Sequence, residues 1–137
     1  MDKKLLRIID ANYNRAKEAM RVAEDVIRFV IQDSKLTDKW KRTRHDLTSI
    51  LFEFPISYRG LVESRHSSED VGRRSLIRDK KTKNSWQDLL TANAKRSQEA
   101  MRVLEELAKM MAPRLAVRFQ QLRFRLYELE KISLRKF

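Results

Sequence analysis

The sequence contains no cysteine, and only two glycines, two prolines and two histidines occur among its 137 residues. Without cysteine, neither a disulfide framework nor thiolate chemistry is available. The shortage of helix-breaking residues, with 42% hydrophobic and 36% charged residues, is typical of a helix-rich protein with a heavily solvated surface. A chain of this length can bury a single hydrophobic core.

Long hydrophobic runs are missing as well. The chain opens MDKKLLRIIDANYN, where the apolar run is too short and too interrupted for a signal peptide. No stretch approaches the roughly 20 apolar residues that a membrane-spanning helix needs. We therefore expect a soluble, cytoplasmic protein that is not inserted in a membrane.

Acidic residues are too few to balance the basic ones. The chain has 31 lysines and arginines against 19 aspartates and glutamates, which gives a net charge of +12 and a sequence pI near 10.3. Such an excess predicts anionic partners, which could be nucleic acid, an anionic membrane surface or phosphorylated small molecules. Charge alone does not choose among them.

One stretch of sixteen residues occurs almost twice. DANYNRAKEAMRVAED runs from Asp10 to Asp25, and TANAKRSQEAMRVLEE runs from Thr91 to Glu106. With a shift of 81, nine positions are identical, and several of these are polar, which is more than helical composition alone supplies. The repeat predicts a duplicated hairpin, two copies facing each other across a shared site, or both.

Hydrophobic periodicity predicts four helices and no strand. They run over residues 3–32, from Ser34 or Thr37 as the cap to Phe54, from Asn84 or Ser85 to about Met111, and from Pro113 towards residue 134. Both glycines fall in a long basic connection over residues 55–84, where ISYRGLVES suggests one short helical turn.

The repeat extends into the second helix of each unit. RHDL, which begins at Arg44, aligns with RFRL, which begins at Arg123, after a change of two residues in the offset. These patterns predict an all-α fold, a four-helix bundle made of two αα-hairpins with internal pseudo-two-fold symmetry. The repeat units are residues 3–54 and 85–134, and the basic loop 55–84 joins them.

The repeated polar residues occupy defined positions on their helices. Asn12 falls near the centre of the apolar face and Arg15 on its edge, while Glu18, Arg21 and Glu24 are predicted to turn towards solvent. The third helix repeats this arrangement with Asn93, Arg96, Glu99, Arg102 and Glu105. Under a pseudo-two-fold we expect Asn12 and Asn93 to approach one another near the bundle axis.

Two interpretations of these residues remain open. The first is structural: a buried Asn pair can set helix register, and charges three residues apart form weak surface ion pairs. The second is a polar pocket between helices, where bundles commonly build their sites. In that pocket Asn and Arg would bind substrate oxygens, while Glu18 and Glu99 would hold a metal or orient the arginines.

Other candidate residues carry weaker signals. Neither His45 nor His66 has a second His or Cys at ligand spacing, so a zinc site is not expected. The loop residues Arg65, Asp70, Val71, Gly72, Arg73 and Arg74 combine a glycine with arginines suited to phosphate, although a solvated turn explains them equally well. No P-loop or Rossmann fingerprint occurs.

Several segments together resemble a known family. RIIDANYNRAKEAMRVAEDVIRF, RTRHDL, SRHSSEDVG, TANAKRSQEAMRVLEELAKM and LRFRLYELEK are similar to the small helical domain found ahead of thiamine-phosphate synthase in bacterial fusions, and also as a stand-alone protein. That family is identified as a noncanonical hydroxymethylpyrimidine-phosphate kinase. The resemblance covers essentially the whole chain, and its most specific part is the paired N-x-x-R-x-x-E-A-x-R-V-x-E pattern.

The resemblance implies an ATP- and magnesium-dependent transfer that converts 4-amino-5-hydroxymethyl-2-methylpyrimidine phosphate to the diphosphate in thiamine biosynthesis. His66 stands where the family has an acidic residue, which leaves Glu69 or Asp70 as the loop carboxylate for magnesium. A chain of this length is too short for a (β/α)₈ barrel of about 250 residues, so we do not expect synthase activity.

This gives a hypothesis for each candidate residue. Arg15, Arg96 and Arg44 are the catalytic cations; Asn12, Asn93, Arg65, Gly72, Arg73 and His45 bind substrate; Glu18, Glu99 and Asp70 hold Mg²⁺, with ATP as co-substrate.

Two rival functions come from other classes of protein. A nucleic-acid-binding bundle has no recognised motif to support it. A partner domain of the synthase would use exposed Phe124, Val117 and Tyr127, although these residues could instead form a homodimer.

Overall fold

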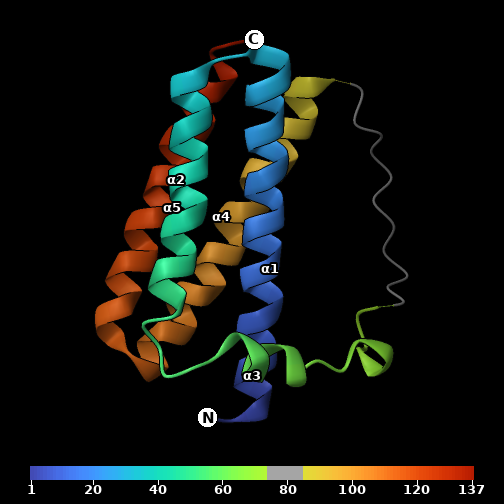
Figure 1. Ribbon diagram of the computed structural model, residues 1–137, viewed down its shortest axis with the longest axis vertical. Coiled ribbons are helices and arrows are strands. Elements are labelled where there is room, and N and C mark those ends of the chain that lie inside the picture. Colours follow the sequence, from blue (N-terminus) through green and yellow to red (C-terminus); the bar gives the residue numbers. More distant parts are fainter. Residues whose placement is uncertain (74–84) are drawn as a thin grey trace.

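The computed structural model describes residues 1–73 and 85–137, and over these residues it is a four-helix bundle without strands. Figure 1 shows the long helices running side by side along the vertical axis. They are α1 (Lys3–Asp25), α2 (Ser34–Leu51), α4 (Trp86–Met111) and α5 (Pro113–Leu134), with the short α3 (Tyr58–Glu63) beside one end. The predicted all-α fold is confirmed.

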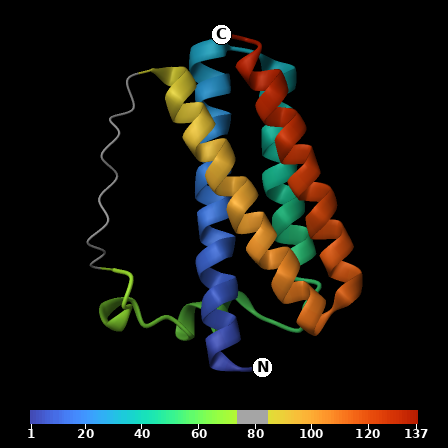
Figure 2. The ribbon, with the colours of Figure 1, turned by 180° about the vertical axis from the view of Figure 1, so that it is seen from behind.

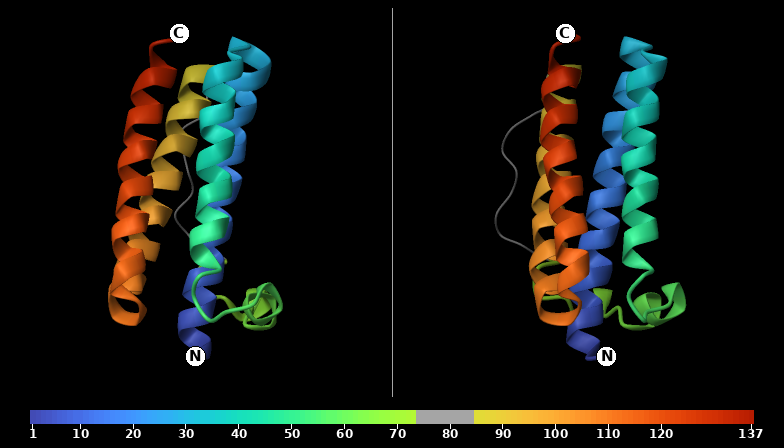
Figure 3. Two further views of the ribbon diagram at one scale, coloured as in Figure 1. Left: turned by 60° about the vertical axis from the view of Figure 1, so that its left-hand side comes forward. Right: turned by 90° about the vertical axis from the view of Figure 1, so that its left-hand side faces the viewer.

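The bundle consists of two antiparallel hairpins. α1 pairs with α2 and α4 pairs with α5, and Figure 3 shows the two hairpins side by side. The hairpins pack mainly through α1 and α4, which cross in opposite directions in the view of Figure 2. Small residues allow this close approach, since Ala16, Ala19 and Ala100 are all buried.

The core fills the space between the four helices. Its largest fully buried side chains come from every long helix and include Ile9, Met20, Trp40, Leu47, Leu90, Met101, Leu115 and Phe119. Buried polar groups find partners across the core: the Trp40 indole donates to Ser133 Oγ at 3.0 Å, which ties α2 to α5. The helical periodicity of the apolar residues therefore predicts most of the core, although Ile8 of the first helix is 44% exposed.

The end of the first hairpin differs from the expected pattern. The helix over residues 3–32 does not stay α-helical, because Val26–Ile31 form a π-helical segment, η1. Gln32 ends it in the left-handed region with φ of 62°. The cap of α2 is Asp33, whose carboxylate accepts from Leu36 N at 2.9 Å, so the expectation of Ser34 or Thr37 is wrong. That bond, with Lys136 nearby, lowers the pKa of Asp33.

The predicted start of the third helix is confirmed, since Ser85 caps α4 by accepting from Asp88 N at 3.0 Å. The expected helical turn in ISYRGLVES is α3, and a 3₁₀ turn, η2 (Ser67–Glu69), follows it. Residues 74–84 of the predicted connection, which include Arg74, lie outside the described residues. Among the helices described, none has the length and apolar character needed to cross a membrane.

Candidate functional site

The polar residues of the repeat line one pocket between α1 and α4. This α1/α4 pocket has a volume of about 610 Å³ and is lined by equivalent residues from both helices. The pairs, each related by the shift of 81, are Asn12 and Asn93, Arg15 and Arg96, Glu18 and Glu99, Ala19 and Ala100, and Val22 and Val103. The duplicated sequence thus forms a single shared cavity about the pseudo-two-fold axis.

The antiparallel packing decides where each pair lies in the pocket. The two helices run in opposite directions (Figure 2), so we infer that Asn12 lies towards the Val103 end of the pocket and Asn93 towards the Val22 end. This direction of packing sets the two asparagines towards opposite ends, which argues against the expectation that they meet near the axis. A two-fold axis brings equivalent residues together only where it passes, and we infer that this is near the middle pair of the pocket, Glu18 and Glu99.

Each asparagine is fixed by its own helix. Asn12 Nδ2 donates to Ile8 O and Asn93 Nδ2 donates to Leu89 O, both at 2.9 Å. Both residues are buried, and their Oδ1 atoms accept no hydrogen bond from another described residue. A buried amide held by one end presents its other end in a fixed position, which suits the binding of a donor group on a ligand.

The four charged residues of the pocket differ from the other charges of the protein. Arg15, Glu18, Arg96 and Glu99 are exposed, and none makes an ion pair or a side-chain hydrogen bond with another described residue. By contrast, Glu53 contacts both Arg114 and Arg118 across the surface. Two arginines and two carboxylates that face one cavity can therefore bind a ligand of mixed charge or a metal-bound anion.

A second cavity adjoins the first because Glu18 lines both. This Asp10 pocket, about 470 Å³, lies between α1 and the segment after α3. Arg65 makes a bidentate contact with buried Asp10, with Nε to Oδ2 at 2.6 Å and Nη2 to Oδ1 at 3.0 Å. The hydrogen bond with Asp10 raises the pKa of the Arg65 guanidinium. Asp70 lines the same pocket, beside His66.

The remaining loop candidates lie outside these cavities. Gly72 N donates to Asp70 Oδ1 at 2.8 Å, and Arg73 Nη1 donates to Ser67 O at 3.5 Å. Both bonds hold the loop in a turn. Neither Gly72 nor Arg73 lines the α1/α4 pocket or the Asp10 pocket, so the structure does not bring them together with the repeated residues.

Arg44 and His45 are also separated from the α1/α4 pocket. Arg44 Nη2 contacts buried Glu24 at 3.2 Å inside the first hairpin, and exposed His45 lies beside it. In the second hairpin Arg123 contacts buried Glu105 at 2.8 Å. The prediction that Glu24 and Glu105 face solvent is wrong, because each neutralises an arginine of the neighbouring helix.

Sequence reasoning missed three of these residues. Glu24 and Glu105 recur in the repeat together with Arg44 and Arg123, and two recurring opposite charges on paired helices were a signal for an internal ion pair. Asp10 had no such signal, because its counterpart in the second unit is Thr91 and its partner Arg65 is distant in sequence.

The donors present fit magnesium better than zinc. Within residues 1–73 and 85–137 no group of three or more His, Cys, Asp or Glu side chains gathers as a metal cluster. Mg²⁺ usually takes one or two protein carboxylates and completes its shell with waters and substrate phosphates. Glu18 and Glu99, exposed in one pocket, supply that kind of oxygen donor.

The fold and the site define a helical domain built by duplication around one polar pocket. The chain matches the ThiD2 family over residues 7–132, and it belongs to that family. It is 35% identical to the thiamine-phosphate synthase of Synechocystis sp. over 126 residues, and 32% identical to that of Rhodopirellula baltica over 123 residues. These alignments cover 92% and 90% of this chain.

The chain spans about a third of the length of these relatives, 35% of the Synechocystis protein and 32% of the Rhodopirellula protein. A similar 35% identity over 130 residues relates it to the thiamine-phosphate synthase of a Synechococcus species. No solved structure matches the chain. The comparisons therefore connect this domain to thiamine biosynthesis.

Proposed function

We propose that this protein is an ATP- and magnesium-dependent kinase that phosphorylates 4-amino-5-hydroxymethyl-2-methylpyrimidine phosphate to the diphosphate. The observation that carries the proposal is the α1/α4 pocket, where paired Asn, Arg and Glu residues of both repeats face one cavity. Membership of the ThiD2 family, whose relatives are named as thiamine-phosphate synthases, gives the pathway in which such a reaction belongs.

The chemistry needs cations more than it needs a base. An acceptor phosphate oxygen is already anionic near neutral pH, so no proton has to be removed before it attacks the γ-phosphorus of ATP. A new P–O bond forms while the bond to the β-phosphate oxygen breaks, and ADP leaves with that oxygen. The main obstacle is repulsion between two polyanions, and positioned cations lower it.

The described residues can divide this work. Arg15 and Arg96 face the cavity from opposite helices, so they can neutralise the acceptor and the transferred phosphoryl group on two sides. Bound Mg²⁺ would neutralise phosphate oxygens, and Glu18 and Glu99 would hold it there. Asn12 and Asn93 present fixed carboxamide oxygens at the two ends, where an amino group of a ring can donate.

The Asp10 pocket extends the same site. Asp10 holds the guanidinium of Arg65 at the edge of a cavity that shares Glu18 with the α1/α4 pocket. The Asp10 contact fixes the geometry of Arg65 and keeps its guanidinium protonated, while the carboxylate offsets part of its positive charge. We assign Arg65 to positioning of a phosphate and Asp70 to a water-mediated contact with magnesium, with the α1/α4 pocket as the reacting centre.

A turnover assay with ATP, Mg²⁺ and the pyrimidine phosphate tests this function, with the unphosphorylated alcohol run in parallel. ADP and pyrimidine diphosphate should form in equal amounts from the phosphate. The alcohol should react at least about 100-fold more slowly, because its hydroxyl must lose a proton and the two pocket carboxylates, Glu18 and Glu99, are assigned to magnesium. Comparable rates with both acceptors, or no turnover by folded protein at any magnesium concentration, would disprove the proposal.

One observation favours a second candidate function, a partner domain for the synthase. The matched segment makes up only about a third of relatives named thiamine-phosphate synthase. Val117, Phe124 and Tyr127 on α5 are exposed, as expected, and offer an apolar surface for association with another domain or a second copy. This alternative predicts assembly with the synthase without ATP turnover, so the same assay separates the two functions.

A further inference from the structure

A cavity larger than the α1/α4 pocket lies away from the candidate active site. This η1/α2 notch, about 810 Å³, is at the end of the bundle where α1 passes through η1 into α2, near the C-terminus in Figure 1. Four cationic side chains line it: Arg21, Arg28, Lys41 and Arg44. At about 100° per residue, Glu24 in the notch lies on the opposite face of α1 from Arg15, so the two cavities are separate.

The equivalent arginines of the two repeats, Arg123 and Arg44, have different contacts. Arg123 Nε and Nη2 contact Glu105 at 2.8 and 3.5 Å, and its Nη1 donates to Tyr127 OH at 2.9 Å. Its guanidinium also lies 5.0 Å from the ring centroid of Phe124. The hydrogen bonds to Glu105 and Tyr127 raise the pKa of Arg123. The second repeat therefore engages all three nitrogens of its arginine and places two aromatic rings beside the guanidinium.

The first repeat leaves the equivalent arginine incompletely paired. Arg44 reaches Glu24 Oε2 only through Nη2, at 3.2 Å, and shares that oxygen with Arg21 Nη1 at 3.1 Å. Arg44 Nε is buried without a hydrogen-bond partner. His45 and Thr48 stand where the second repeat has Phe124 and Tyr127, so no aromatic pair closes this side. The result is an open notch around an arginine with unused donors.

The rim of the notch adds an aromatic surface. Phe29 belongs to η1 and is 63% exposed, and the Arg28 guanidinium lies 4.9 Å from its ring centroid. A π-helical segment of this kind often occurs at functional sites. A phenylalanine of such exposure beside an arginine provides a face on which a flat ring can stack.

The acidic side chains of the notch are mostly engaged already. Glu24 pairs with two arginines, and Asp33 binds Leu36 N and Lys136 Nζ, the latter at 3.0 Å. Asp38 contributes one negative charge from an exposed position. Arg28, Lys41 and the remaining donors of Arg44 therefore leave a net positive cavity, which favours an anionic ligand.

We propose that the η1/α2 notch is a second binding site, specific for a ligand that carries both a phosphate group and a flat ring, as a nucleotide does. Arg28 and Lys41 bind the phosphate, and Phe29 stacks on the ring. The Arg44 guanidinium turns to complete its hydrogen bonds on the ligand. This proposal does not depend on the kinase function, because the site lies on the other face of α1. None of its residues has a role in the proposed phosphoryl transfer. Arg44 and His45 were candidates for that reaction in the sequence analysis, but the structure separates them from the α1/α4 pocket.

The test uses AMP, inorganic phosphate and adenosine as probes, titrated into the full chain and followed by amide chemical shifts. AMP should perturb residues from Arg28 to Lys41 and should bind more tightly than either fragment. The double variant Arg28→Ala/Lys41→Ala should weaken AMP binding at least about tenfold, and Phe29→Ala should remove the advantage of AMP over phosphate. Turnover should be unchanged in both variants.

A matched control is Lys109→Ala, since Lys109 stands at the position of Arg28 in the second repeat and is exposed. It removes one positive charge and should leave AMP affinity unchanged. Three results would overturn the proposal: equal weakening by Lys109→Ala, equal affinity for phosphate and AMP, or shifts confined to Asn12–Val22 and Asn93–Val103. If turnover is absent but these binding results hold, only the kinase function fails.

Discussion

Replacing Arg96 with alanine should lower kcat about 100-fold or more while the unfolding temperature stays nearly constant. Arg96 faces the α1/α4 pocket, is exposed, and contacts no other charged group among the described residues. Its removal therefore costs the fold little. Loss of one positioned cation from a phosphoryl-transfer site typically has an effect of this size on the rate. Arg15→Ala should behave in the same way, because Arg15 is its symmetry-related counterpart.

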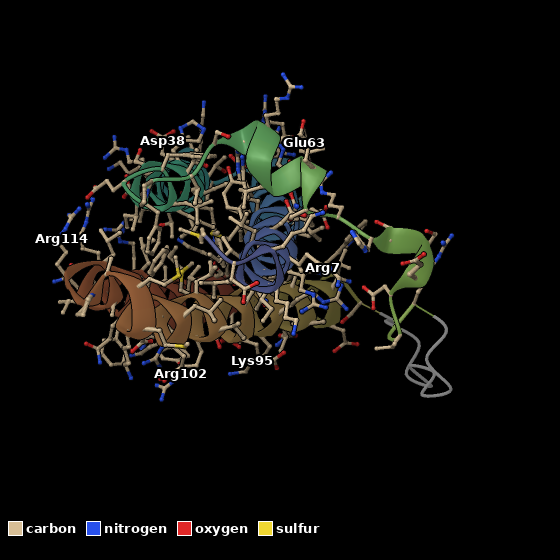
Figure 4. The ribbon with its side chains drawn as sticks, turned by 90° about the horizontal axis from the view of Figure 1, so that it is seen from below. Arg7, Asp38, Glu63, Lys95, Arg102 and Arg114 are labelled. Atoms are coloured by element: carbon tan, nitrogen blue, oxygen red, sulfur yellow. The ribbon has the colours of Figure 1, made fainter. Side chains whose placement is uncertain are left out.

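Arg102→Ala is the matched control for this experiment. Arg102 lies on the same helix, and Figure 4 labels it on the outer side of the bundle, where it pairs with Glu106 at 3.1 Å. It should leave kcat unchanged. Arg96→Lys should recover only part of the activity, since lysine keeps the charge and loses the bidentate geometry. An equal loss of stability and activity in Arg96→Ala would instead support the interpretation that these residues only set helix register.

Replacing Glu105 with alanine should destabilise the protein by about 3–5 kcal/mol. Glu105 is 2% exposed and holds the nearly buried Arg123 between α4 and α5. Its loss leaves a buried guanidinium without its counter-charge, and this cost exceeds the net contribution of the intact pair. The double variant Glu105→Leu/Arg123→Met should recover most of the stability, because it removes both charges together.

The neighbouring Glu106 provides the control for stability. Glu106 is exposed, and hydrogen bonding to Lys109 lowers its pKa. Glu106→Ala should leave the urea midpoint nearly unchanged, because exposed ion pairs contribute little. Urea unfolding followed by circular dichroism measures all three variants. If Glu105→Ala unfolds at the same midpoint as Glu106→Ala, the pair with Arg123 is not a structural feature of the bundle.

The sequence predicts the fold well because the fold follows from periodicity and duplication. Apolar residues at helical spacing define the four helices, and the shift of 81 anticipates that α1 and α4 meet about a pseudo-two-fold axis. The π-helical η1 has no comparable signal. Its wider turn connects α1 to Gln32 and to the cap at Asp33. The path of the chain there is set by packing at the end of the hairpin.

The site is harder to predict because it depends on the direction of packing. A repeat identifies Asn12 and Asn93 as equivalent, but the antiparallel direction of the two helices is needed to infer that they lie towards opposite ends of the pocket. The different surroundings of Arg15 and Arg44 also depend on which residues the neighbouring helix places opposite each of them. Arg15 faces a cavity, whereas Arg44 faces Glu24. Periodicity gives the side of one helix on which a residue lies, and the neighbouring helix decides what it contacts.

The measurement that tests the central claim most directly is substrate protection of a single thiol placed in the α1/α4 pocket. The chain has no cysteine, so Val103→Cys introduces the only reactive thiol, at a half-buried wall of the cavity. Valine and cysteine are similar in size, so the pocket should keep its shape. Val117→Cys on the exposed face of α5 is the control for changes in labelling chemistry.

We expect the pyrimidine phosphate to slow maleimide labelling of Val103→Cys in a saturable way, with half protection at a concentration close to its KM. Labelling of Val117→Cys should not change. Undiminished labelling of Val103→Cys at saturating substrate, in a variant that still turns over, would contradict the claim that the pocket between the two repeats is the active site.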